Sequence, residues 1–189
     1  MPEGIAEKVK DGVIGAVKGA GDVVGAIRST VTYLVVGTLK DAGEITSTAL
    51  GVVTDAVRGA LRGTEETGTD AAQSARAVVS GAVEAVVQVG GDVVEGAKKA
   101  VRGAIRGAAE IGRDVGVTAV GAVEGAVEAA GKVGKDVTSV ATGAAQQALE
   151  SAGEISKDAV EAVKKGLSSA ASLPRDVIQS VVKGEKEQK

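Results

Sequence analysis

Residues 88–115 read QVGGDVVEGAKKAVRGAIRGAAEIGRDV and contain one full repeat of the chain between two glycine-bearing junctions. Between the junctions, Ala, Val and Ile fall on one side of a helical wheel, and Lys, Arg and Glu fall on the other. The apolar arc covers close to half the circumference, which is wider than the seam of a coiled coil. This stretch therefore predicts an amphipathic helix with a broad face of small apolar residues.

The same pattern recurs at intervals of 11 residues along most of the chain. Eleven residues correspond to three helical turns at about 3.67 residues per turn. From Val9, each eleventh residue is small and apolar until Pro174, with Thr64 as the exception. We expect this stripe to serve packing or surface binding, and its residues are Val9, Ala20, Val31, Ala42, Val53, Ala75, Val86, Ala97, Ala108, Ala119, Ala130, Ala141, Ala152 and Val163.

A coarser period of 22 residues divides the chain into repeats at about 3–24, 25–46, 47–68, 69–90, 91–112, 113–134, 135–156 and 157–173. Glycines recur at this spacing, although Gly inside a helix costs roughly 1 kcal/mol relative to Ala. Small side chains let helix backbones approach closely, so we expect these glycines to mark close contacts between helices. They are Gly15, Gly37, Gly59, Gly81, Gly103 and Gly125.

The junctions between repeats carry signals for the end of one helix and the start of the next. QVGGDV (88–93), EIGRDV (110–115) and KVGKDV (132–137) each place a Gly before an Asp, as helix C-termini and N-caps require. The expected caps are Asp70, Asp92, Asp114, Asp136 and Asp158. The junctions favour an all-α fold of about eight antiparallel helices over residues 1–173. Fewer, long continuous helices remain the alternative, because the 11-residue stripe crosses the junctions.

The C-terminal part departs from the repeat. Pro174 interrupts the helical pattern, because a proline inside a helix removes a hydrogen bond and clashes with the preceding turn. Residues 174–189 are expected to form a short helix at about 176–182 and a polar tail.

One repeat, 25–46, is apolar nearly all round. Arg28 falls on the apolar arc of the wheel, whereas Tyr33 and Val36 fall on the polar arc. This repeat is expected to be either buried or a contact patch.

Charges near the middle of the repeats alternate in sign. AVRGALRG (56–63) and AVRGAIRG (100–107) are basic, whereas VVSGAVEA (78–85) and AVEGAVEA (122–129) are acidic. Either the two kinds neighbour one another in antiparallel hairpins, or they keep the surface solvated.

The composition limits the chemistry that the chain can perform. It has no His and no Cys, so general bases and nucleophiles are restricted to carboxylates, Lys, Ser, Thr and Tyr33. Zinc ligands are missing, and no D-x-D-x-D-G calcium loop occurs. We therefore expect no catalytic residue, no metal site and no cofactor.

The charge balance also bears on partners and location. With 22 basic and 25 acidic residues the net charge is −3, which argues against binding to nucleic acid. The N-terminal residues are charged where a signal peptide needs an apolar core, and no apolar stretch approaches the roughly 20 residues of a spanning helix. These features favour a cytoplasmic protein.

The 11-residue amphipathic repeat resembles a loose class that includes synucleins, perilipins, exchangeable apolipoproteins and late-embryogenesis-abundant proteins. Residues 7–13, EKVKDGV, resemble the synuclein repeat K-T-K-E-G-V. The resemblance implies binding to lipid surfaces or protection during drying, often with folding on contact.

These observations predict a non-enzymatic helical-repeat protein with a structural or stress-protective role. It would act through its wide Ala/Val/Gly face, by self-association and by covering a lipid or protein surface. The alternative is a lipid-binding coat that is disordered in water and helical on membranes.

Overall fold

The computed structural model describes residues 3–184, which form helices and connecting turns. The helices of this part of the chain are α1 (Glu3–Val17), α2 (Val23–Asp41), α3 (Gly51–Glu66), α4 (Ala71–Gln88), α5 (Val93–Glu110), α6 (Val115–Lys132), α7 (Val137–Gly153), α8 (Lys157–Ser169) and α9 (Arg175–Gly184). The prediction that the chain turns back at every repeat is confirmed, and the alternative of fewer continuous helices is wrong. The part of the predicted polar tail after Gly184 lies outside the described residues.

Glycines with a left-handed backbone end most of the helices. Those with positive φ are Gly19, Gly43, Gly68, Gly90, Gly112 and Gly134. At the end of α5, Gly112 has a φ of 71°. The backbone N–H of Arg113 there donates to the carbonyl of Ala108 at 2.9 Å. This is the Schellman closure, which satisfies carbonyls that the helix itself cannot use.

Aspartates begin the next helices. The side chains of four predicted caps accept a backbone N–H of the first turn, and these are Asp70, Asp92, Asp114 and Asp136. The prediction for Asp158 is wrong, because Ser156 caps α8 and Asp158 lies in the first turn of that helix. Ser156 stands 22 residues after Gly134, where the repeat would place a junction glycine. The turn between α7 and α8 is therefore shorter than the turns before it.

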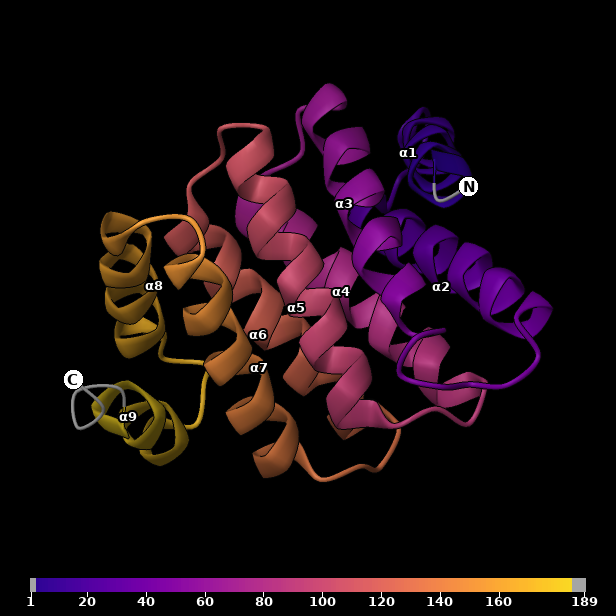
Figure 1. Cartoon of the computed structure of the whole chain (residues 1–189). Helices are drawn as coiled ribbons and strands as arrows, with labels where there is room; N and C mark the ends of the chain where they lie inside the picture. Colours follow the sequence, from indigo (N-terminus) through magenta and orange to yellow (C-terminus); the bar gives the residue numbers. More distant parts are fainter. Residues whose placement is uncertain (1–2, 185–189) are drawn as a thin grey trace.

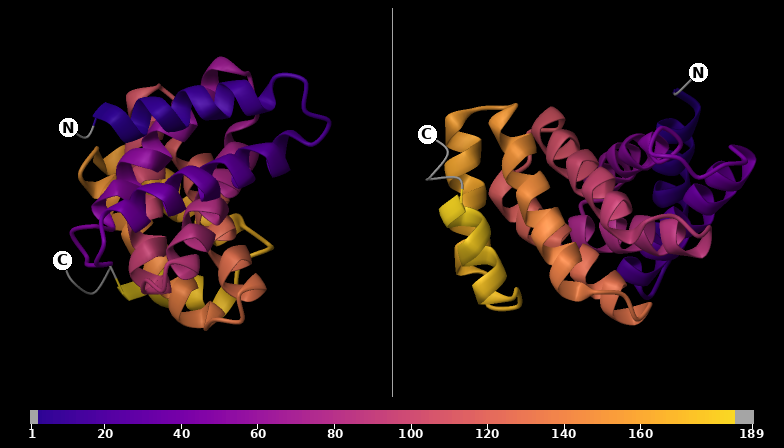
Figure 2. Two further views of the ribbon diagram at one scale, coloured as in Figure 1. Left: turned by 90° about the vertical axis from the view of Figure 1, so that its right-hand side faces the viewer. Right: turned by 60° about the horizontal axis from the view of Figure 1, so that its bottom comes forward.

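The helices stack in two layers (Figure 1). One layer holds α1, α3, α5 and α7, and the other holds α2, α4, α6 and α8, so that each helix packs mainly on its second neighbour in the chain. Short turns make consecutive helices antiparallel, and second neighbours within a layer are consequently parallel. Figure 2 shows the array from two further sides, with α1 and α2 at one end and α8 and α9 at the other.

One apolar core runs through the array between the layers. It extends from Ile5 in α1 to Val181 in α9, and much of it consists of Ala and Val. Because Ile178 and Val181 belong to this core, α9 packs onto the array instead of forming a separate unit. Among residues 3–184, no helix is both long enough and apolar enough to cross a membrane.

Candidate functional site

The predicted stripe of small residues lies almost entirely inside the molecule. Of its members, only Ala20 and Ala42 escape full burial. Ala20 lies in the turn after α1 and Ala42 is the C-cap of α2, so both stand beyond the helix whose face they were expected to share. The other members are buried between helices, and the stripe is used up by packing within the chain.

Three alternate members of the stripe also close a helix. The carbonyls of Val86, Ala108 and Ala130 accept the N–H of the residue five positions later, each at 2.9 Å. This double use explains why the 11-residue period crosses the turns unbroken. The same residue packs in the core through its side chain and ends the helix through its carbonyl.

Thr64, the exception in the stripe, is fully buried and hydrogen bonded. Its carbonyl accepts the N–H of Thr69 at 3.1 Å, as in the other junctions. Its hydroxyl donates to the carbonyl of Leu61 at 2.8 Å and receives Nη1 of Arg113 at 3.4 Å. The threonine thus provides a polar contact for an arginine that approaches from the next junction in the same layer.

Arg113 is a charged residue with a largely buried side chain that the repeat pattern did not single out. Only 9% of its side chain is exposed, and its guanidinium bonds the carboxylate of Glu65. Its Nη2 also donates to the carbonyl of Thr69 at 2.9 Å. Lys135 occupies the equivalent position one repeat later and is exposed, so the repeat itself carries no signal for this contact.

The repeated glycines bring helices of one layer into backbone contact. A Cβ added to Gly103 would lie 2.6 Å from the carbonyl oxygen of Thr54, and one added to Gly81 would lie 2.5 Å from that of Arg28. Gly59 and Gly125 face backbone carbonyls in the same way, at Ala6 and Arg76. Side chains have no room at these positions, so glycine is required by the spacing of the helices.

Two of the six predicted contact glycines make no such contact. Gly15 and Gly37 have no atom of another helix within 4 Å of an added Cβ. They lie in α1 and α2, the first helices of their layers, which have no earlier neighbour to dock against. Conversely, Gly63, Gly116 and Gly121 pack on backbone carbonyls without having been predicted.

Threonine hydroxyls reinforce the close approach between parallel helices. Thr54 of α3 donates to the carbonyl of Lys99 in α5 at 3.0 Å. Thr32 of α2 donates in the same way to Gly81 in α4 at 3.0 Å. Small residues at the contact bring the helices close enough for such bonds from a side chain to the backbone of a neighbouring helix.

Ion pairs follow the same second-neighbour spacing along the outer surface. Arg102 and Arg106 of α5 both bond Glu154 at the end of α7, at 3.1 and 2.6 Å. Arg58 and Arg62 of α3 meet Glu110 in α5 in the same arrangement, 44 residues earlier. The interpretation that basic and acidic centres would neighbour one another in antiparallel hairpins is wrong. The basic centres pair instead with glutamates at the ends of parallel neighbours.

Ion pairs and hydrogen bonds shift the pKa values of several side chains, and each shift favours the charged form of the group. The hydrogen bond from Arg106 lowers the pKa of Glu154, and the one to Glu66 raises the pKa of Lys10. Partial burial acts to raise the pKa of Glu128, but bonds from Lys132 and Arg76 outweigh it and lower the pKa. A hydrogen bond from Ser139 lowers the pKa of the cap Asp136. These groups are therefore ionised at neutral pH and serve as partners in pairs and caps.

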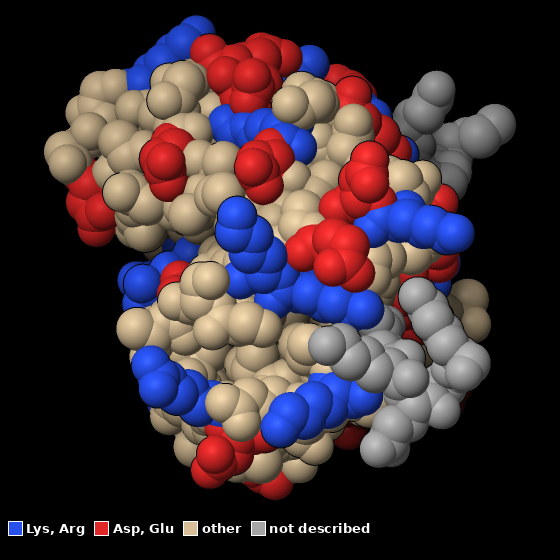
Figure 3. All heavy atoms as spheres, turned by 90° about the vertical axis from the view of Figure 1, so that its left-hand side faces the viewer, with Lys and Arg blue, Asp and Glu red and all other residues tan. Residues whose placement is uncertain are grey.

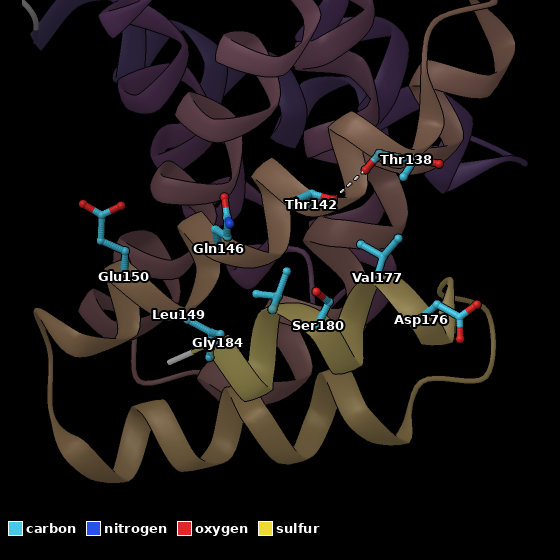
Figure 4. A pocket seen from close by; sticks show the side chains of 10 residues that line it. Thr138, Thr142, Gln146, Leu149, Glu150, Asp176, Val177, Ser180 and Gly184 are labelled. Atoms are coloured by element: carbon cyan, nitrogen blue, oxygen red, sulfur yellow. Dashed lines mark hydrogen bonds between the residues drawn. The ribbon is translucent and has the colours of Figure 1, made fainter. Parts of the chain in front are cut away.

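An open groove of about 770 Å³ lies between α7 and α9 (Figure 4). Its lining includes Thr142, Leu149 and Glu150 from α7 and Asp176 and Ser180 from α9. Both carboxylates are exposed, and the Thr142 hydroxyl is already bonded to the carbonyl of Thr138 at 2.9 Å. Within residues 3–184 no group of three acidic side chains is placed to hold a metal ion.

No protein-family model and no curated protein matches the sequence. The solved structures do contain a similar fold, the crystal structure of the de novo designed helical repeat protein DHR7. The alignment covers 100% of this chain and 98% of that chain, with a TM-score of 0.51 and 20% sequence identity. The fold is that of a helical repeat protein. At this level of identity, the likeness concerns the fold alone.

Proposed function

We propose that the protein is a non-enzymatic, structural helical-repeat protein whose Ala/Val/Gly face serves the packing of its own helices. The observation that carries this proposal is the contact of glycine with the backbone of the second-neighbour helix, as at Gly103 and Thr54. Such contacts fix the distance between helices, because close-packed protein interiors do not deform easily. The array thus supplies a rigid frame.

The charged groups support a structural role over a catalytic one. Catalytic acids and bases need pKa values near the working pH, usually set by burial and by like charges. Here the pKa values of Glu128 and Glu154 are lowered by cationic partners, which moves both groups away from that range. The arginines in turn are engaged by these glutamates across parallel helices.

The proposal extends to protection under stress. The sequence has no Cys or Trp, and its one methionine is Met1, so few side chains can be oxidised. A rigid frame with a mixed-charge surface would withstand drying and separate less stable proteins from one another. The test is the activity of a dried and rehydrated client enzyme with this protein present. Albumin at equal mass serves as the control, and protection no better than albumin would remove this part of the proposal.

The competing function is a coat that folds only on lipid. It would require the helices to separate, because the stripe from Val53 to Val163 is buried against neighbouring helices. Circular dichroism with and without anionic phospholipid vesicles distinguishes the two functions. The proposed frame is helical in buffer and melts cooperatively, and vesicles leave its spectrum unchanged. A coil spectrum in buffer that becomes helical on vesicles would overturn the proposal and favour the coat.

A further inference from the structure

The middle of α2, at one edge of the array, has an uncharged, partly apolar surface. Residues 29–38 contain no charged side chain, and Ser29, Tyr33 and Gly37 are exposed along one stripe of the helix. Tyr33 is the one aromatic residue of the chain, and 79% of it is exposed. The repeat 25–46 was expected to be either buried or a contact patch, and the exposure of Tyr33 excludes burial at this residue. Exposed Tyr is typical of contact surfaces, where its ring supplies a rigid apolar area.

The register of the repeats shows which way Tyr33 and Gly37 face. In α6, the equivalent positions are Gly121 and Gly125, and both press on the backbone of α4. In α4 they are Ala77 and Gly81, and Gly81 presses on α2. Tyr33 and Gly37 therefore lie on the side of α2 where a preceding helix would pack if the layer had one. Figure 2, left, looks onto this end, where α1 and α2 lie uncovered.

The opposite end of the array has a different surface. There α9 packs against α7 and α8, and the exposed residues of α8 include Asp158, Glu161 and Lys165. Figure 3 shows this end with acidic and basic side chains interspersed. Repeat arrays need polar outer faces on their terminal units to remain soluble. The α8–α9 end fits this requirement, whereas the middle of α2 carries no charged side chain.

We propose that two copies of the chain associate through their α2 edges, with Tyr33 of each copy packed over Gly37 of the other. This inference rests on the proposed structural function, and it names a second copy of the chain as the partner of the uncovered α2 edge. The α2 surface has the same register as the glycine faces through which α4 packs on α2 and α6 packs on α4. A second copy carries the same surface, and its opposite end is charged, so the matching partner is another α2 edge.

The arrangement follows from the spacing of the two residues. When two α2 helices lie antiparallel with their exposed faces together and the two-fold axis level with the buried Val35, residue 33 of one lies opposite residue 37 of the other. The ring of Tyr33 then enters a space in which nothing lies within 4 Å of the Gly37 Cβ position. A parallel crossing like those inside the molecule has no room for the ring of Tyr33. In those crossings the position equivalent to Tyr33 holds Ala77 in α4 and Gly121 in α6. The association therefore closes as a two-fold dimer and does not extend into a filament.

The mass of the full chain in solution tests the dimer. Light scattering after size-exclusion chromatography should give twice the 18.5 kDa chain mass as concentration rises. Tyr33→Ala and Gly37→Leu should each return the mass to that of one chain, with circular dichroism unchanged. Gly131→Leu, an exposed glycine on α6, is the matched control and should leave the dimer intact. A wild-type protein at single-chain mass, or a Gly37→Leu variant at dimer mass, would overturn the proposal.

A swap variant tests the antiparallel register. In Tyr33→Gly/Gly37→Tyr, each ring again lies opposite a glycine of the other copy, and the dimer should return. A swapped protein that stays at single-chain mass would overturn this register. Failure here is distinct from failure of the proposed function. A single chain that is helical and melts cooperatively keeps its structural role, whereas a chain that is coil in buffer loses both.

Discussion

A methyl group added to Gly103 would lie 2.6 Å from the backbone carbonyl oxygen of Thr54. The contact joins α5 to α3, and it recurs in register through the array at Gly59, Gly81 and Gly125. Each of these glycines gives up helix propensity inside its own helix. The loss is offset by apolar surface buried on a neighbouring helix, which explains how a chain so rich in Gly and Val forms stable helices.

The first prediction compares two glycines of the same register. Gly103→Ala should lower the free energy of unfolding by about 1–3 kcal/mol, because the added methyl overfills a packed contact. Gly15→Ala should raise it by up to about 1 kcal/mol, because alanine favours the helix and nothing obstructs its methyl group. Urea unfolding followed by circular dichroism measures both. Equal effects at the two positions would show that the spacing of the helices does not depend on glycine.

The second prediction concerns the capping residues of α5 and α8. Asp92→Ala and Ser156→Ala should each cost about 1 kcal/mol, because each side chain accepts an N–H of the first turn. Asp158→Ala should cost about 0.3 kcal/mol, since Asp158 contributes only its charge near the helix N-terminus. The same urea experiment ranks the three variants. A loss at Asp158 as large as that at Asp92 would contradict the assignment of Ser156 as the cap.

These results indicate what local sequence could and could not predict. Helix ends were predictable, because Gly at C′ and Asp at the N-cap act through the backbone within a few residues. The prediction of Asp158 as a cap was wrong because the turn before α8 lacks a glycine and is shortened. The cap of α8 is therefore Ser156. The buried stripe was also predictable from local sequence, because helical periodicity shows which face of each helix is apolar.

The candidate contact surface depended on information that no single repeat contains. Gly15 and Gly59 have the same place in the repeat, yet only Gly59 has a helix to dock on. The difference is their position in the array, which becomes evident only when second neighbours are known to share a layer. The pairing of Arg106 with Glu154 likewise depends on parallel neighbours 44 residues apart in register. Antiparallel hairpins considered alone cannot reveal it.

The third prediction addresses the buried guanidinium of Arg113. Arg113→Lys should lower the free energy of unfolding by about 1–3 kcal/mol, because one ammonium cannot reproduce the bonds to Glu65, Thr64 and Thr69. Arg76→Lys is the matched control, since Arg76 also pairs with a glutamate but is 51% exposed. Its cost should stay below about 1 kcal/mol. A loss at Arg113 no larger than that at Arg76 would mean that burial adds nothing to this contact.

The fourth prediction concerns stability in acid. Bonds from Lys132 and Arg76 outweigh the effect of partial burial and hold the pKa of Glu128 below its ordinary value of 4.5. A carboxylate with a lowered pKa in the folded state stabilises the protein above its unfolded pKa. That contribution disappears as the pH falls through the lowered value, because the folded state must then take up a proton. The wild type should therefore lose stability as the pH falls below about 4.5, the ordinary value of the glutamate pKa.

Glu128→Gln removes this titration, so its stability should fall less steeply over the same pH range. The contribution at neutral pH should be less than about 1 kcal/mol, because the pairs are partly solvated. Glu161→Gln, which replaces an exposed glutamate on α8, serves as the control and should keep the wild-type slope. Urea unfolding at a series of pH values measures the slopes. If Glu128→Gln and the wild type fell in parallel, the acid sensitivity would have to come from other carboxylates, with Glu154 and its partner Arg106 the next pair to replace.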